Sequence, residues 1–188
     1  MDIANLTTTS RILEPGLWQV DPTRERYRVP ACGVIVVELY PEDVLVVQDP
    51  EGGQIAEIVP FTAEGTGDPA LLGISKSLPA EGLREILSGK SESACLVRDR
   101  MERRGLDLSS AKATVLFAPD SLAKEEFSFQ VTSHTTCVIA APGSMMTVEG
   151  ATLPPTDLQV FVQRASLPEK GHEIELPNPL ADPRLDFR

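Results

Sequence analysis

The chain has 188 residues, a formal net charge of −11, 41% hydrophobic residues and 24% charged residues. These values are close to those of ordinary globular domains and argue against extensive disorder. The acidic balance argues against a general nucleic-acid binder, and no apolar run approaches the ~20 residues of a membrane span. The three cysteines are too scattered for a disulfide scaffold, so a cytoplasmic location is expected.

The chain divides into three parts by composition. Residues 1–17 form a polar N-terminal arm, and residues 18–166 carry the patterned β domain. Residues 167–188 are a proline-rich linker, because prolines with interspersed charges do not build regular structure. This end suggests a following domain.

Three strands are predicted first along the chain, at residues 33–39, 44–49 and 54–59. Their β-branched residues are bounded by Pro and Gly, as in GVIVVEL between two prolines. The connections at 40–43 and 50–53 contain Pro-Glu pairs typical of tight turns. We expect the three strands to form a meander.

Two helices and further strands follow. Helices are predicted at about 80–88 and 91–105, each with apolar residues at helical spacing and a glycine at its end. The later strands are predicted at 113–117, 127–131, 137–140 and 158–162. The fold class is therefore mainly β: an antiparallel sandwich or distorted barrel of short strands with two or three peripheral helices.

A polar cluster around the 50–53 turn is the first candidate ligand-binding site. Its members are Asp49, Glu51, Gln54 and Glu57. Paired carboxylates can do acid–base chemistry when burial separates their pKa values. On a tight turn the plainer interpretation, a solvated hairpin, is favoured.

No metal site is predicted, and no catalytic residue is assigned. The chain has neither a Cys-x-x-Cys nor a His-Glu-x-x-His motif, and it lacks a serine nucleophile elbow and a phosphate loop. Buried cysteines often act simply as small apolar residues. The alternative is a metal held by Cys32, His134 and Cys137, of which the last two are three apart beside a strand.

Four arginines, at positions 98, 100, 103 and 104, lie in the last turns of the second predicted helix. They favour the negative end of the helix dipole, which is the simpler interpretation. A site for an acidic partner is the alternative.

Several short motifs resemble a known family. The stretch VVQDPEGGQ at 46–54, preceded by YPED at 40–43, resembles the urea carboxylase-associated domain family. AAPG at 140–143 and PPTDLQVFV at 154–162 look like the end of the same domain. The version found ahead of aminomethyltransferase-like, folate-binding domains is the most similar, and the resemblance covers roughly 18–187.

This resemblance implies a zinc-dependent parent enzyme. It would split trimethylamine N-oxide into dimethylamine and formaldehyde, which passes to tetrahydrofolate. The family's cysteine ligands fall here at Ile55 and Ala141, which cannot bind zinc, and Glu57 stands where the family has an aspartate. The chain therefore looks like a metal-free copy, with zinc and tetrahydrofolate bound elsewhere in the parent.

Three functions remain open on the sequence. The first is a non-catalytic structural or assembly module whose partners are following domains of the same polypeptide or sister subunits, as a homo-oligomer. The second is a free-standing metalloenzyme acting on a small amine. The third is a β-barrel that binds a small molecule near Asp49 and Gln54.

Overall fold

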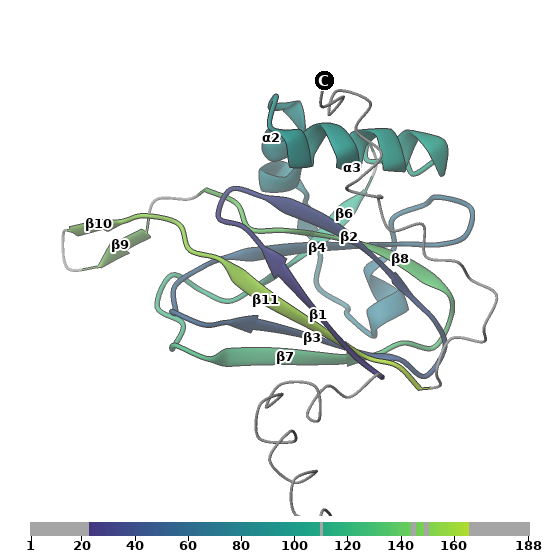
Figure 1. Cartoon of the computed structure of the whole chain (residues 1–188), viewed down its shortest axis with the longest axis horizontal. Helices are drawn as coiled ribbons and strands as arrows, with labels where there is room; N and C mark the ends of the chain where they lie inside the picture. The colour runs from purple at the N-terminus through teal and green to yellow at the C-terminus, as the bar shows by residue number, and fades with distance from the viewer. Residues whose placement is uncertain (1–22, 110, 144–145, 149–150, 166–188) are drawn as a thin grey trace, which may run out of the picture.

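Two antiparallel β-sheets face each other in the computed structural model, which describes residues 23–109, 111–143, 146–148 and 151–165 (Figure 1). The four-stranded sheet has the order β1-β11-β3-β7, and the five-stranded sheet has the order β2-β8-β4-β6-β5. Strands β9 and β10 pair separately. The strand bounds are β1 Arg24–Val29, β2 Val34–Leu39, β3 Val44–Asp49, β4 Ala56–Phe61, β5 Leu78–Pro79, β6 Lys112–Leu116, β7 Glu125–Gln130, β8 Thr135–Ala140, β9 Met146–Val148, β10 Ala151–Leu153 and β11 Leu158–Gln163.

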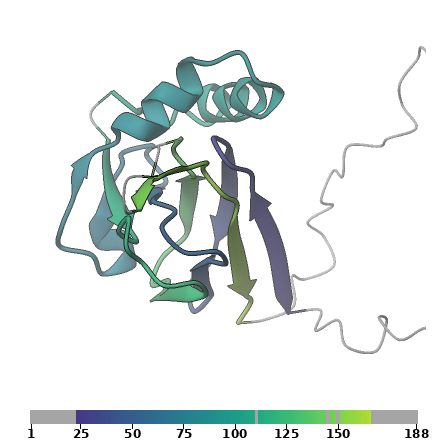
Figure 2. The ribbon, with the colours of Figure 1, turned by 90° about the vertical axis from the view of Figure 1, so that its left-hand side faces the viewer.

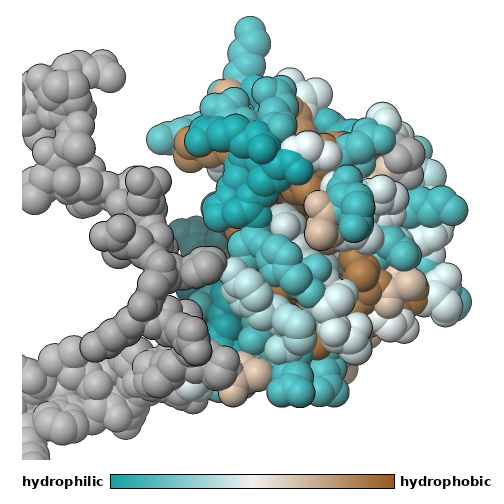
Figure 3. All heavy atoms as spheres, turned by 90° about the vertical axis from the view of Figure 1, so that its right-hand side faces the viewer, coloured by the Kyte–Doolittle hydropathy of each residue, from teal (hydrophilic) through white to brown (hydrophobic). Residues whose placement is uncertain are grey.

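Two α-helices, α2 (Glu81–Ser88) and α3 (Glu92–Arg103), lie together on one side of the sandwich (Figures 1 and 2). A short 3₁₀ helix, η2 (Pro69–Leu72), precedes them. None of the helices in the described part of the chain is long and apolar enough to cross a membrane. Figure 3 shows a mostly polar surface with apolar side chains between the polar ones.

The hydrophobic core has two parts because the five-stranded sheet is covered on both faces. Between the sheets, Leu45 and Val160 pack against Ile58 and Ile139. On the other face, residues such as Val138 pack against both helices. Every residue of β4 and β8 is accordingly buried, whereas β3 and β11 alternate between buried and half-buried positions.

The predicted fold class is confirmed in its sandwich form: the described strands make two antiparallel sheets and no closed barrel. Both helices were predicted, and the strand at 44–49 has the predicted bounds. The strand at 54–59 lies two residues later, at 56–61, because residues 54 and 55 belong to the preceding loop. Strand β1 was not predicted, since its alternating arginines look like a polar segment.

The predicted meander is wrong. Strand β3 joins the four-stranded sheet, while β2 and β4 lie in the other sheet with β8 between them. The side chain of Asp43, just before β3, binds Arg164 and the backbone N–H of Ala165 just after β11. These contacts hold the start of β3 beside β11.

The boundaries of the predicted parts are only partly described. The arm at 1–17 and the linker at 167–188 lie outside the described residues, as do residues 18–22 and 166 at the two ends of the predicted β domain. From residue 23 to residue 165 the described chain forms the layered sandwich.

Candidate functional site

Asp49, at the end of β3, is fully buried and organises the loop that follows. Its carboxylate accepts hydrogen bonds from the backbone N–H groups of Gly52 and Gln54, both at 2.9 Å, and from the hydroxyl of Ser121 at 3.1 Å. The expected solvated hairpin is therefore wrong. A carboxylate placed under its own loop satisfies backbone donors that burial would otherwise leave unpaired.

Gln54 is also buried, and its amide joins three segments of backbone. Its nitrogen donates to the carbonyls of Ile55 at 2.8 Å and Pro142 at 3.0 Å. Its oxygen accepts from the N–H of Thr156 at 2.8 Å. The amide thus uses both of its N–H donors, and one of the two lone pairs of its oxygen, in hydrogen bonds within the protein.

Glu57, on β4, caps helix α2 from outside the helix. Its two oxygens accept from the N–H groups of Gly82 at 3.0 Å and Leu83 at 2.8 Å. The N-cap residue of α2, Ala80, makes no side-chain hydrogen bond of its own. A carboxylate at a helix N-terminus satisfies free donors and meets the positive end of the helix dipole.

The side chains of the four predicted site residues do not converge on a common point. Glu51 is exposed, and the other three each bind a different set of backbone or hydroxyl partners. The Gln54 amide links the loop at 50–55 to the segments at 142 and 156, and the Glu57 carboxylate links β4 to α2. This arrangement stabilises the fold, and it directs the carboxylates of Asp49 and Glu57 to different partners.

The alternative metal ligands are not brought together. Cys137 is fully buried, and burial raises the pKa of its thiol. Cys32 is exposed in a turn, and His134 is half exposed and bound to Glu38 at 3.0 Å. Within the described ranges no group of three or more His, Cys, Asp or Glu side chains is placed to hold a metal ion.

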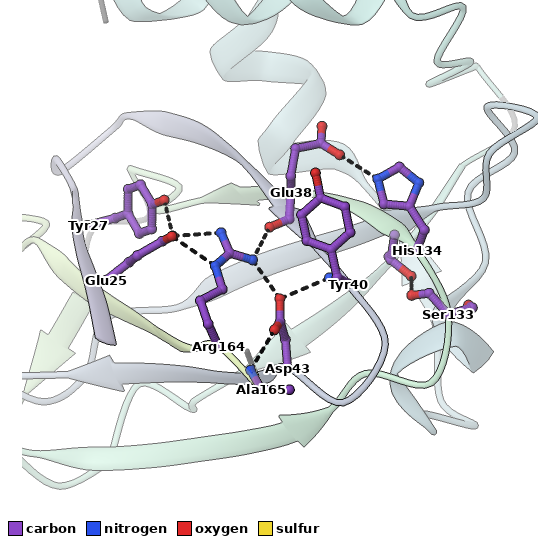
Figure 4. Close-up of polar contacts among 10 residues, drawn as sticks. Glu25, Tyr27, Glu38, Tyr40, Asp43, Ser133, His134, Arg164 and Ala165 are labelled. Carbon is purple, nitrogen blue, oxygen red and sulfur yellow. Dashed lines mark hydrogen bonds and ion pairs between the residues drawn. The ribbon is translucent and has the colours of Figure 1, made fainter. Parts of the chain in front are cut away.

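A second polar network, centred on Arg164, was missed by sequence reasoning (Figure 4). The guanidinium donates to both oxygens of Glu25, at 2.8 and 2.6 Å, and to Asp43 at 2.6 Å. It also donates to the backbone carbonyl of Glu38 at 2.8 Å. These contacts join β1, the β2–β3 turn and the end of β11.

The charges in this network support one another. Burial opposes ionisation of Glu25, but hydrogen bonds from Arg164 and Tyr27 outweigh it and hold the pKa of Glu25 below its usual value. Burial and the hydrogen bond to Glu25 raise the pKa of Tyr27 to about 12. Arg164 is also partly buried, yet its bonds to Glu25 and Asp43 keep its pKa above the usual value.

An aromatic pair extends the network toward the surface. The rings of Tyr40 and His134 stack with centroids 5.1 Å apart, and the Tyr40 ring lies 5.8 Å from the Arg164 guanidinium carbon. Glu38 binds His134, Thr136 and Arg104, the last from the C-terminal end of α3. Nothing in the local sequence marks these residues as neighbours, because they lie in or next to β2, β8, α3 and β11, which are far apart along the chain.

The arginines of α3 are partly engaged inside the protein. Arg98 donates to the carbonyls of Leu87 and Gly89 at the end of α2, the latter at 2.7 Å. Arg104 pairs with Glu38. Arg100 and Arg103 remain exposed, so a site for an acidic partner on this helix stays a prediction.

No protein-family model matches the chain. A curated relative, a trimethylamine-oxide aldolase from Ruegeria pomeroyi, is 37% identical over 179 residues. The chain is similar to one part of that aldolase. The match takes in 95% of this chain and 22% of the aldolase, so the chain spans about a fifth of the relative's length.

Among solved structures, a DUF1989 family protein from Silicibacter pomeroyi has a TM-score of 0.40 and 12% sequence identity. That comparison covers 77% of this chain and 80% of the other. The likeness is too low to support an argument about function.

Proposed function

We propose that this chain is a non-catalytic structural or assembly module at the N-terminus of a trimethylamine-oxide aldolase-like demethylase. The observation that carries the proposal is the 37% identity over 95% of the chain to only 22% of that enzyme. The module would be of the urea carboxylase-associated type and would act in the cytoplasm. Its partners would be the following domains of the same polypeptide or sister subunits.

The use of the polar residues supports a structural role. Asp49, Gln54 and Glu57 would be the natural ligand-binding groups, and each is buried with its hydrogen bonds made inside the fold. Groups that hold loops and a helix in place cannot also change partners during a reaction without loosening those elements. We therefore assign these residues to shaping the module.

Zinc, which the resemblance implies for the parent enzyme, does not fit the residues described here. Zinc sites use Cys, His and carboxylate ligands, and Ile55 and Ala141 stand at the family's cysteine positions. Glu57, at the family's aspartate position, binds the start of α2. Zinc and tetrahydrofolate would accordingly bind elsewhere in the larger enzyme, and no reaction step is assigned to this chain.

The proposed parent reaction needs no oxidant. Trimethylamine N-oxide, (CH3)3NO, contains the same atoms as dimethylamine plus formaldehyde, because one methyl carbon is oxidised as the nitrogen is reduced. A carrier such as tetrahydrofolate then takes the formaldehyde. The whole sequence would occur in the neighbouring parts of the enzyme.

A domain exchange tests the proposal. The stretch of the Ruegeria aldolase that matches this chain is replaced by the 188-residue chain, and formaldehyde release from trimethylamine N-oxide is measured. We expect the chimera to keep activity, while the 188-residue chain alone releases none. Formaldehyde production by the chain alone would overturn the proposal.

Metal analysis gives a second test that does not depend on the chimera folding. We expect the purified 188-residue chain, mixed with zinc and then desalted, to retain far less than one zinc per chain. Stoichiometric zinc that survives desalting would contradict a metal-free module. Cys137→Ser serves as a control, because zinc lost in that variant would point to the alternative ligand set.

A further inference from the structure

The outer face of the four-stranded sheet is uncovered by the elements that the structure describes. Both helices pack on the five-stranded sheet, on the opposite side of the molecule (Figure 2). Side chains of the four-stranded sheet alternate, so that one set enters the core and the other faces outward. The outward set of β1, β11, β3 and β7 forms a surface that we call the open face.

The open face carries cations along one edge, an acid at the other and apolar groups between them. Arg24, Arg26 and Arg28 project from β1, and Glu126 projects from β7. The β-sheet register places Arg26, Phe161 and Val46 in one row across β1, β11 and β3. Arg28 and Glu126 end the next row, with a glutamine on each strand between them.

The arginines are held in place against the sheet. The Arg24 and Arg26 guanidinium carbons lie 4.6 and 5.8 Å from the centroid of the Phe161 ring. Arg28 pairs with Asp157 at 2.5 Å, although its own side chain is 72% exposed. Arginine and aromatic residues are enriched at protein interfaces, whereas lysine, absent from this face, is depleted.

Two simple arrangements of these faces about a two-fold axis place that axis across the strands or parallel to them. An axis across the strands would set β1 against the partner's β1 and bring six arginines together, which repulsion disfavours. An axis parallel to the strands sets β1 against the partner's β7. In that arrangement Phe161 lies over the partner's Val46, and Arg28 lies over the partner's Glu126.

We infer that the open face binds the same face of a second copy of this chain, with the two-fold axis parallel to the strands. The interface is isologous, so each contact occurs twice. The two Phe161 rings form its apolar centre, and an Arg28–Glu126 pair closes each edge. This inference specifies the surface for the proposed self-association and does not depend on the enzyme to which the module belongs.

The size of the face sets the expected strength of the dimer. Four strands at ~4.8 Å spacing and six residues at ~3.4 Å each give a face of about 19 by 20 Å. Its projected area of about 400 Å² per partner is about half of the ~800 Å² per partner of a standard specific interface, as in weak, transient contacts. The dimer is therefore expected to dissociate on dilution rather than to be permanent.

Charge reversal in the 188-residue chain tests the arrangement. Sedimentation velocity over a concentration series measures the monomer–dimer equilibrium of the parent chain and of Arg28→Glu, Glu126→Arg and the double variant. Each single reversal creates two like-charge contacts and should weaken the dimer at least about tenfold. The double variant restores opposite charges and should recover affinity to within about threefold of the parent.

The matched control is Arg100→Glu, the same charge change at an exposed position of α3, which should leave the dimer unchanged. Arg28→Glu also loses the contact with Asp157, but the double variant loses it too. Positions 28 and 126 lie on opposite edges of one sheet, three strand spacings or ~14 Å apart. Recovery in the double variant therefore reports contact between copies.

Three results would overturn the inference. The parent chain could remain monomeric over the whole series, or it could form a dimer that neither single reversal weakens. The double variant could also stay as weak as the single variants. Thermal unfolding of each dilute monomer confirms that the variants are folded.

Discussion

Glu57 is the residue whose role differs most from its local sequence context. It lies in a β-strand beside a turn, which suggests a solvent-exposed carboxylate, yet it is 7% exposed and caps a helix that begins 24 positions later along the chain. A helix whose N-cap residue, Ala80, offers no side-chain hydrogen bond needs such a group, because its first N–H groups have no partner within the helix.

Replacing Glu57 by Ala should lower the free energy of unfolding by about 1–2 kcal/mol, since the first turn of α2 loses its acceptors. Glu57→Gln keeps one acceptor oxygen and should cost about half as much. Urea unfolding followed by circular dichroism measures both effects. The control is Glu51→Ala, an exposed carboxylate of the same cluster, for which the change should stay within ~0.5 kcal/mol.

Glu25 should make stability depend on pH. Its pKa in the folded protein is below the ordinary value of 4.5, so the unfolded chain binds the proton more tightly. Its contribution is complete above the ordinary value and is lost as the pH falls through the folded pKa. Urea midpoints measured between neutral and acidic pH should therefore fall less steeply in Glu25→Gln than in the parent chain; equal slopes would contradict this.

At the scale of elements, Arg164 joins strands that are distant in the sequence. Glu25 and Arg164 are 139 positions apart, and Asp43 lies between them in the turn that leads into β3. The guanidinium is 11% exposed and Asp43 is 3% exposed, so removing either partner would leave a buried charge unpaired.

Arg164→Leu should cost about 3–5 kcal/mol of unfolding free energy, because Asp43 stays buried without its cation. Arg164→Lys should recover only part of the loss, since an ammonium cannot bind both oxygens of Glu25 in the same way. Chemical denaturation gives both values. Arg28→Ala, which removes an exposed ion pair at the other end of β1, should change stability by less than ~1 kcal/mol.

Arg98 joins the two helices in a similar way. Its guanidinium donates hydrogen bonds to backbone carbonyls at the C-terminal end of α2, which have no N–H partner within the helix. Arg98→Ala should speed amide hydrogen exchange in α2 and lower stability by about 1–3 kcal/mol. The same change at the exposed Arg100 should alter neither quantity, and equal effects at both positions would contradict the assignment.

The elements themselves were largely predictable, and their partners were not. Runs of β-branched residues between prolines predicted β2 and β3, and apolar residues at helical spacing predicted α2 and α3. Strand β1 was missed because every second residue is an arginine that faces outward. Pairing depends on contacts such as Asp43 with Ala165, which no local pattern records.

For the whole molecule, the layered arrangement places one cysteine where only unfolding can expose it. Cys137 lies between the two sheets with its pKa raised by burial, whereas Cys32 is exposed. A thiol reagent should therefore label Cys32 in the native protein and Cys137 only when the sandwich opens. Mass spectrometry of Cys32→Ser during a urea series should show labelling at Cys137 rising with the unfolded fraction.

By itself, the sequence determined the mainly β class, the positions of most strands and both helices, because these follow from residue spacing and turn residues over short stretches. Only the tertiary structure decided which sheet each strand joined and what the polar residues did. Asp49 and Glu57 became buried through partners supplied by distant segments, Ser121 and Leu83. Burial and pairing depend on such long-range contacts, so the same carboxylates that suggested a binding site are, in the folded chain, groups that hold it together.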